Sequence, residues 1–293
     1  MSTVLVMASR NIRVYVRNRM SVFFSFLSVL IIIALYALFL GKMQANGITA
    51  AAGGLPGIRW LVDSWIMASL LAVNAVTLPL GVLGTMVFHK EYKRFPDFLV
   101  APVRRSSIVV SYLISACVIS LLFSLVAFVA GELYIVAGGG RLLGAHDAAR
   151  VVGMLTREVV SSSSIMFLIA SFLASGSAFG ALGTILGTLI GFITGVYVPL
   201  GILPEAVQKF VVLLPFTHGA AMLHQVFCEA PLAVVFGNVP PALRSALLEK
   251  YDKMYGVRIF WGRTEISMLV MVAGAALVFL LLTTARMRSR KSS

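Results

Sequence analysis

Six stretches of the chain are apolar over about the length that a helix needs to cross a lipid bilayer. A transmembrane helix takes about 20 mostly apolar residues, and lipid offers no partner to an exposed backbone N–H or C=O, so each stretch is predicted to be helical. The chain is 59% hydrophobic and only 12% charged, which argues against a soluble core. The sequence therefore predicts an all-α integral membrane protein with a single domain over residues 1–293. The six predicted spans are 22–41, 64–88, 108–136, 159–179, 181–200 and 265–285.

Lys and Arg are concentrated on one side of the predicted membrane. If the first span runs outward from the cytoplasm, the cytoplasmic segments hold thirteen of the 24 Lys and Arg but only two of the 11 Asp and Glu. Basic residues are retained on the cytoplasmic side of membrane proteins. We therefore predict a multi-pass protein of the plasma (inner) membrane with both termini in the cytoplasm. The net charge of +13 does not indicate nucleic-acid binding, because the cations form no single groove-sized cluster.

The first twenty residues are periodic but not apolar enough to span. Arg10, Arg13 and Arg17 lie at i, i+3 and i+7 and share one helical face, while apolar residues supply much of another. This pattern predicts an amphipathic helix over 1–20 that lies in the headgroup region. A purely topogenic role as a basic anchor is compatible with the same pattern.

The segments between the spans differ in character. Residues 89–106 form the only substantial cytoplasmic segment between two spans, and residues 138–157 are predicted to form a polar outer loop that could contain one short helix. Residues 204–228 contain apolar pieces too short to cross the membrane, with Pro204 and Pro215 at favourable helix-start positions. We predict that these pieces are short re-entrant helices in the outer leaflet, surrounded by protein or water.

The fifth predicted span contains a regular series of glycines. Small residues at every fourth position allow another helix to approach closely, which in lipid favours helix–helix contact. We predict a packing face inside the protomer or across a dimer axis. Its glycines are Gly183, Gly187, Gly191 and Gly195.

The chain lacks the sequence patterns of catalytic and cofactor sites. It has no G-x-x-x-x-G-K-[ST] phosphate loop and no H-E-x-x-H metal motif, and no G-x-S-x-G nucleophile elbow. We therefore predict no catalytic residue, no metal ligand and no cofactor bound by this chain. Two polar residues in or near spans, Asn74 and Glu132, are candidates for cargo contact that the sequence leaves open.

Two stretches resemble the permease subunits of type-2 ATP-binding-cassette exporters, and the resemblance covers essentially the whole chain. One is EYKRFPDFLVAPVRR over residues 91–105, which is similar to the family's element after the second span. The other is YVPLGILP at 197–204 with LPFTH at 214–218, which is similar to the segment after the fifth span. The sequence departs from the family at Lys93 and Arg94, which occupy the positions of a frequent Gly-Thr pair.

The resemblance implies that ATP is hydrolysed by a separate cytoplasmic subunit, which also holds the ATP and Mg. The 89–106 segment would then be the coupling helix that this ATPase pushes, with the amphipathic 1–20 helix as a second contact. A second permease protomer, identical or different, is implied as well. The residues expected to contact the ATPase are Glu91, Arg94, Phe95, Asp97, Phe98, Leu99, Arg104 and Arg105.

By the same resemblance, cargo passes between two protomers near the second and fifth spans. The candidate path residues are mostly apolar with few polar groups, the usual composition of a small-molecule site. They are Asn74, Thr77, Leu78, Phe192 and Val196. We predict an ATP-driven exporter of an amphipathic or hydrophobic small molecule, similar to a drug or antibiotic.

Three other functions stay open. The first is export of a lipid-linked polysaccharide, although the fifth span offers few aromatic residues for stacking sugars. The second is a secondary transporter, which needs ionisable groups near the membrane midplane, and the predicted spans contain almost none. The third is a membrane sensor or scaffold that transports nothing.

Overall fold

The computed structural model describes residues 3–35, 56–92, 105–237, 239–261, 264–265, 270–278 and 281. Helices make up nearly all of this part, which confirms the predicted all-α class; residues 270–278 are also helical. Two-residue strands β1 (Phe260–Trp261) and β2 (Thr264–Glu265) pair antiparallel. The helices are α1 (Thr3–Arg17), α2 (Arg19–Leu35), α4 (Ile58–Glu91), α6 (Arg105–Ala137), α7 (Ala145–Phe172), α8 (Gly176–Ile193), the 3-10 turn η2 (Leu200–Ile202), α9 (Glu205–Val211), α10 (Pro215–Val235) and α11 (Pro241–Tyr255).

Within the described ranges, four helices are long and apolar enough to cross a membrane. They coincide with α4, α6, α7 and α8, and α9 with α10 would make a fifth span if this pair, bent by 91°, is one broken span. The predicted spans 22–41 and 265–285 lie partly outside the described residues, although α2 covers much of the first. A membrane protein with four or five such helices is therefore established among the described residues.

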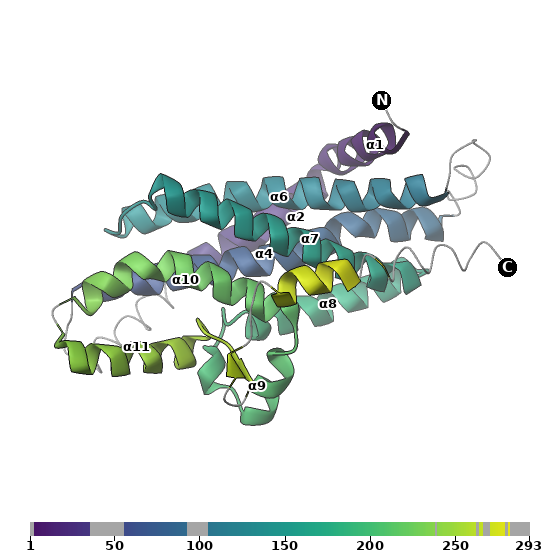
Figure 1. Cartoon of the computed structure of the whole chain (residues 1–293). Helices are drawn as coiled ribbons and strands as arrows, with labels where there is room; N and C mark the ends of the chain where they lie inside the picture. Colours follow the sequence, from purple (N-terminus) through teal and green to yellow (C-terminus); the bar gives the residue numbers. More distant parts are fainter. Residues whose placement is uncertain are drawn as a thin grey trace.

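Helix α4 is the centre of the bundle. It packs against α6, α7, α8 and α10, and the long helices run side by side along the molecule (Figure 1). Its side chains are buried along almost the whole helix, including Ile66, Leu71 and Leu83. Its 34 residues extend about 51 Å at 1.5 Å per residue, well beyond the roughly 30 Å of a hydrocarbon core. We refer below to its two ends as the Ile58 end and the Glu91 end.

Helix α1 lies at the Glu91 end, where α6 begins (Figure 1). Ala8, Asn11 and Tyr15 form its buried side against α6, and the Tyr15 ring meets Phe123 edge to face at 6.3 Å. The helix predicted within residues 1–20 is therefore confirmed. Asn18 then separates α1 from α2, and its Oδ1 accepts a hydrogen bond from the Ser21 amide at 3.2 Å, which caps the start of α2.

The helix that covers most of the fourth predicted span has different bounds from that span. Helix α7 begins at Ala145, so most of the predicted 138–157 outer loop is helical. The reason is that Val151 and Leu155 continue the apolar face of α7 outward and are fully buried. At its other end α7 stops at Phe172, seven residues before the predicted boundary at 179.

Helix α8 also differs from the predicted 181–200 span. It begins early, at Gly176, because Ser175 caps it by accepting a hydrogen bond from the Ala178 amide at 3.3 Å. It ends early, at Ile193, because Gly195 takes a left-handed conformation with φ +83°. The Tyr197 amide then turns back to donate to the Gly191 carbonyl at 3.1 Å, which closes the turn after the helix.

The segment 204–228 forms a sharply bent helix pair, α9 with α10, whose second helix continues to Val235. The re-entrant position predicted for this segment stays a prediction, because the bent pair also fits a broken span. The bend is held by side chains of the first turn of α10. The Thr217 hydroxyl donates to the carbonyls of Val211 at 2.8 Å and Ile193 at 3.2 Å. His218 Nε2 lies 2.8 Å from the Val212 carbonyl. Helix α10 therefore starts beside the end of α8 and then packs along α4 and α7.

The polar segment after α10 contains α11, which ends at Gly256 with φ +67°. Tyr255 packs edge to face on Trp65 of α4 at 5.3 Å and stacks on Tyr251 at 4.5 Å. On the exposed side, Lys253 donates to Glu249 at 2.7 Å and lowers the pKa of that carboxyl below its ordinary value.

Candidate functional site

Most of the predicted ATPase-contact residues lie outside the described residues. These are Arg94, Phe95, Asp97, Phe98, Leu99 and Arg104. Glu91 is the last residue of α4, and Arg105 begins α6. The Glu91 carboxylate lies against Gly176 at the start of α8, where an added Cβ would come within 2.9 Å of its Oε2.

Helix α4 is also joined to α7 at the Glu91 end. Lys90 Nζ donates to the carbonyls of Ala170 at 3.3 Å and Ser171 at 3.2 Å. These carbonyls belong to the last turn of α7, where the helix dipole favours a cation. At the Glu91 end, the ends of α4 and α7 and the start of α8 therefore lie in contact.

The predicted path residues are divided between two environments. Thr77 and Leu78 line a groove of about 410 Å³ that α4 shares with α1 and α2. Asn74, Phe192 and Val196 are not among its lining residues. Asn74 and Val196 are buried in protein, each 1% exposed, whereas Phe192 is exposed on α8. A single cavity walled by all five is therefore not seen in the described part of the chain.

The two glycines in the middle of α8 have free space beside them within the described part of the chain. An added Cβ at Gly183 or Gly187 would have no neighbour within 4 Å among the described residues. Gly191 is covered by the Tyr197 ring, and Gly195 lies beyond the end of the helix. Gly195 therefore does not belong to the helical series, and the packing role of Gly183 and Gly187 stays a prediction.

The polar centre of the bundle was missed by the sequence analysis. Glu158 lies in the middle of α7, is 2% exposed, and neither of its carboxylate oxygens has a hydrogen-bond partner among the described residues. A span predicted to begin at 159 put this residue at the membrane surface. The periodic burial of Val151, Leu155 and Val159 was the signal that could have placed it inside a longer helix.

Helix α10 is shaped around this carboxyl. The Glu158 carboxylate lies directly against Gly219, where an added Cβ would overlap it. Ser162, one turn further along α7, is fully buried and also lacks a partner in the described part. On α4, α7 and α10 the other buried polar atoms without a hydrogen-bond partner there are Asp63 Oδ2, Trp65 Nε1, Asn74 Nδ2, Ser161 Oγ, Ser163 Oγ, His218 Nδ1 and His224 Nδ1, while α6 and α11 contribute Ser120, Ser124, Glu132 Oε1 and Tyr251. Buried polar groups are normally hydrogen-bonded, so this concentration on α4, α7 and α10 is a candidate functional region.

One further residue links α4 to α10 within this region. His224 Nε2 lies 2.7 Å from Ser69 Oγ, and the imidazole stacks on Trp65 with ring centroids 5.8 Å apart. The Ser69 hydroxyl also donates to the Trp65 carbonyl at 2.9 Å. The contact fixes the register of α10 against α4 by polar groups rather than by apolar packing alone.

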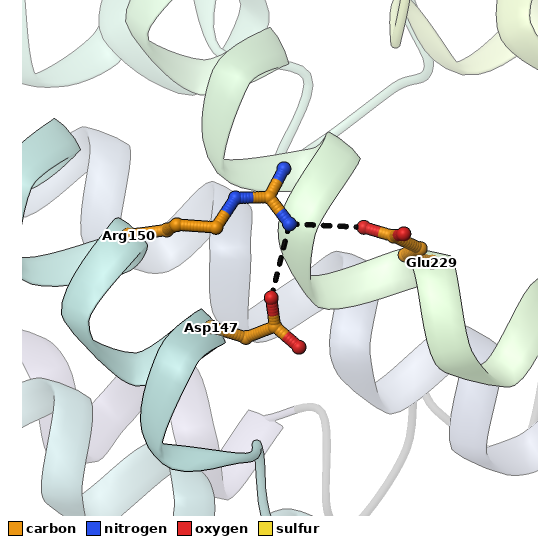
Figure 2. Close-up of polar contacts among 3 residues, drawn as sticks. All are labelled: Asp147, Arg150 and Glu229. Atoms are coloured by element: carbon orange, nitrogen blue, oxygen red, sulfur yellow. Dashed lines mark hydrogen bonds and ion pairs between the residues drawn. The ribbon is translucent and has the colours of Figure 1, made fainter.

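The Ile58 end is tied by charged groups near its surface. Arg150 Nη1 of α7 lies 3.0 Å from Asp147 Oδ1 and 3.1 Å from Glu229 Oε2 of α10 (Figure 2). Glu132, a candidate for cargo contact, accepts a hydrogen bond from the Leu143 amide at 2.8 Å. One of its oxygens is therefore engaged in closing the turn after α6.

These features define a multi-pass α-helical membrane protein with a buried central helix, a polar centre and one largely uncovered apolar helix. The chain matches the family model described as ABC-2 type transporter over residues 2–228, and it belongs to that family. The match begins with α1 and ends inside α10. The resemblance inferred from the sequence is thereby confirmed. The membrane domain of this family is the permease component of ABC transporters, which is distinct from the ATPase component. No curated protein matches the chain.

Proposed function

We propose that this permease exports an amphipathic or hydrophobic small molecule, driven by ATP hydrolysis in a separate cytoplasmic subunit. The observation that carries the proposal is the exposure of α8, whose apolar window is only 11% buried. Its threonines do not make this face polar, since Thr184 and Thr188 donate to the carbonyls one turn back at 3.1 Å and 2.9 Å. An uncovered apolar helix is suited to line a path for an apolar cargo.

A second protomer, identical or different, completes this path in the proposal. It would cover the glycine face of α8 at Gly183 and Gly187, where close helix approach is sterically open. Cargo would then pass along the remaining surface of α8, near Phe192.

The driving subunit contacts the Glu91 end in this proposal, and this end faces the cytoplasm. Support comes from the grouping of α1, the end of α4 and the start of α6 at that end (Figure 1), and from the basic residues of the 89–106 segment. ATP and Mg are bound by the partner, because this chain has no phosphate loop.

Two other functions have a specific observation in their favour. Phe192 and Tyr197 are exposed and lie edge to face at 5.3 Å, an aromatic surface of the kind that stacks on sugars and so favours polysaccharide export. Glu158 favours ion coupling, since it is an ionisable residue inside a spanning helix.

The proposal is tested with the permease purified together with its ATPase and reconstituted in liposomes. We expect ATP-dependent movement of a fluorescent amphipathic probe and probe-stimulated ATP hydrolysis. Phe98→Asp should abolish both while leaving membrane insertion intact, because the apolar side chain that is proposed to contact the ATPase is replaced by a charged one. Phe210→Asp is the matched control, since Phe210 is exposed on α9. Transport that survives ATP depletion but stops with a protonophore would replace the proposal by ion coupling.

A further inference from the structure

A groove lies between the turn that joins α1 to α2 and the middle of α4. Its volume is about 410 Å³, within the range of roughly 300–1,000 Å³ that holds small molecules. At Gly81, α4 contributes no side chain to the groove, and an added Cβ there would meet only the Tyr15 hydroxyl, at 3.9 Å. We call it the elbow groove. Its lining residues are Tyr15, Asn18, Met20, Ser21, Phe24, Thr77, Leu78 and Gly81.

The elbow groove lies on the Glu91 side of the middle of α4 and changes in polarity along its length. Gly81 precedes Glu91 by ten residues of α4, which corresponds to about 15 Å at 1.5 Å per residue. Its α4 residues, Thr77, Leu78 and Gly81, lie between the middle of this helix and its Glu91 end. Asn18 and Ser21 line it at the turn, while Phe24 and Leu78 supply apolar surface further along the helices. A ligand with a polar head group and an apolar tail matches this order of polar and then apolar lining residues.

The charge around the turn is entirely positive. The first 62 residues contain no Asp or Glu. Arg17 and Arg19 flank Asn18, are exposed, and have no hydrogen bond or ion pair within the described ranges. Arg13, by contrast, donates to Ser9 at 3.3 Å. Arg17 and Arg19 do not line the groove themselves, but they adjoin Asn18, which does. Two unpaired guanidinium groups on either side of Asn18 are suited to a phosphate, which arginine binds through parallel N–H donors.

The side-chain chemistry of the turn agrees with an anionic head group. Asn18 Oδ1 is already occupied by the Ser21 amide, so the group that Asn18 can offer to a ligand is its Nδ2 donor. The arginines likewise offer donors only. A carboxylate or phosphate would satisfy these groups, whereas a cationic ligand would not.

We propose that the elbow groove binds one anionic glycerophospholipid from the leaflet at the Glu91 end. Its phosphate lies between Arg17 and Arg19, and one acyl chain lies along Phe24 and Leu78. The seated lipid bridges the α1–α2 turn and α4, so the position of α1 depends on lipid charge. The assignment of this leaflet as cytoplasmic rests on the proposed function; the site itself does not require transport or the ATPase.

The test uses the purified full chain in lipid nanodiscs without ATPase or ATP. Phe24→Trp places a fluorescent reporter in the groove, and the signal of the native tryptophans is subtracted with the unsubstituted chain. Brominated phosphatidylglycerol and brominated phosphatidylcholine are compared as quenchers at equal mole fraction. With each basic residue contributing about 1 kcal/mol toward anionic lipid, we expect at least about fivefold preference for phosphatidylglycerol. Failure of ATP-driven transport leaves this result unaffected.

Two variants in the Phe24→Trp chain separate the site from bulk lipid. Arg17→Gln with Arg19→Gln should remove the preference for phosphatidylglycerol, whereas the matched control Arg13→Gln should keep it. Gly81→Leu should lower quenching by both lipids because the leucine fills the groove, and leucine is the better helix former. Equal quenching by the two lipids in the reporter chain would mean unselected bulk lipid and overturn the proposal. Absence of quenching by both would mean that protein, such as a second copy, covers the groove, and would overturn it as well.

Discussion

Helices α4 and α8 are both apolar enough to cross a membrane, yet they occupy opposite environments. The apolar window of α4 is 89% buried inside the protein, whereas that of α8 is 11% buried. Helix α4 is covered by α6, α7 and α10, while the main contact of α8 among the described elements is α4 itself. Hydrophobicity places both helices in the membrane, but it does not say which of them meets protein and which is open to lipid, cargo or a partner.

The difference has a physical cause in the membrane. Lipid tails are as apolar as leucine, so apolar residues gain little by leaving lipid for protein, and packing and polar contacts decide which helices associate. Helix α4 has both kinds of contact, such as Ser69 with His224 at 2.7 Å. The threonine hydroxyls of α8 are satisfied within the helix, so among the described residues they make no polar contact that would draw another helix onto that face.

Matched leucine substitutions on the two helices test the comparison with the largest expected effect. Leu83 of α4 is 0% exposed and Leu189 of α8 is 49% exposed. Leu83→Ala leaves a cavity and should lower the free energy of unfolding by about 2–5 kcal/mol. Leu189→Ala should change it by less than about 0.5 kcal/mol, as for other exposed positions. Equilibrium unfolding in mixed micelles measures both.

Measuring Leu83→Ala and Leu189→Ala at several protein concentrations tests whether a second protomer covers α8. If a second protomer covers α8, the cost of Leu189→Ala should rise as the protein-to-detergent ratio favours the dimer. If both substitutions lowered the free energy of unfolding equally and strongly at high dilution, α8 would be buried within the protomer, contrary to its exposed surface.

A smaller effect is expected at the contact between α7 and α10. Gly219→Ala places a methyl group on the Glu158 carboxylate, and overpacking of this kind should lower the free energy of unfolding by about 1–3 kcal/mol. In a chain that also carries Glu158→Ala, Gly219→Ala should lower the free energy of unfolding much less, because the carboxylate that the added methyl group would overlap is absent. A double-mutant cycle measures the coupling; additive effects of the two substitutions would contradict the contact.

The smallest effect is expected at the surface of the Ile58 end. Arg150→Ala removes both ion pairs of Figure 2, whose side chains are between 37% and 66% exposed. Exposed pairs contribute at most about 1 kcal/mol, and the loss should shrink further at high salt. Arg157→Ala is the control, since Arg157 is exposed on α7 and makes no ion pair within the described ranges. A larger loss for Arg150 at high salt would indicate a structural role beyond charge.

Several elements were predictable because their signals are local. The apolar runs of α4 and α6 end close to their predicted boundaries, and the prolines at 204 and 215 correctly marked the starts of α9 and α10. The family was recognised from short motifs and confirmed by the match over residues 2–228. The length of α7 was not predictable in this way, because its outer half is amphipathic and is helical only against its neighbours.

The amino-acid sequence by itself determined that the chain enters the membrane, that it is helical and that it belongs to a permease family, since these follow from hydropathy and short motifs. Only the tertiary structure decided that α4 is enclosed, that α8 is open, that Glu158 lies buried against Gly219, and that α4 and the α1–α2 turn leave a groove between them. The physical reason is that burial depends on which segments pack together. Segments distant in the chain meet through shape and a few polar contacts, which hydropathy does not encode.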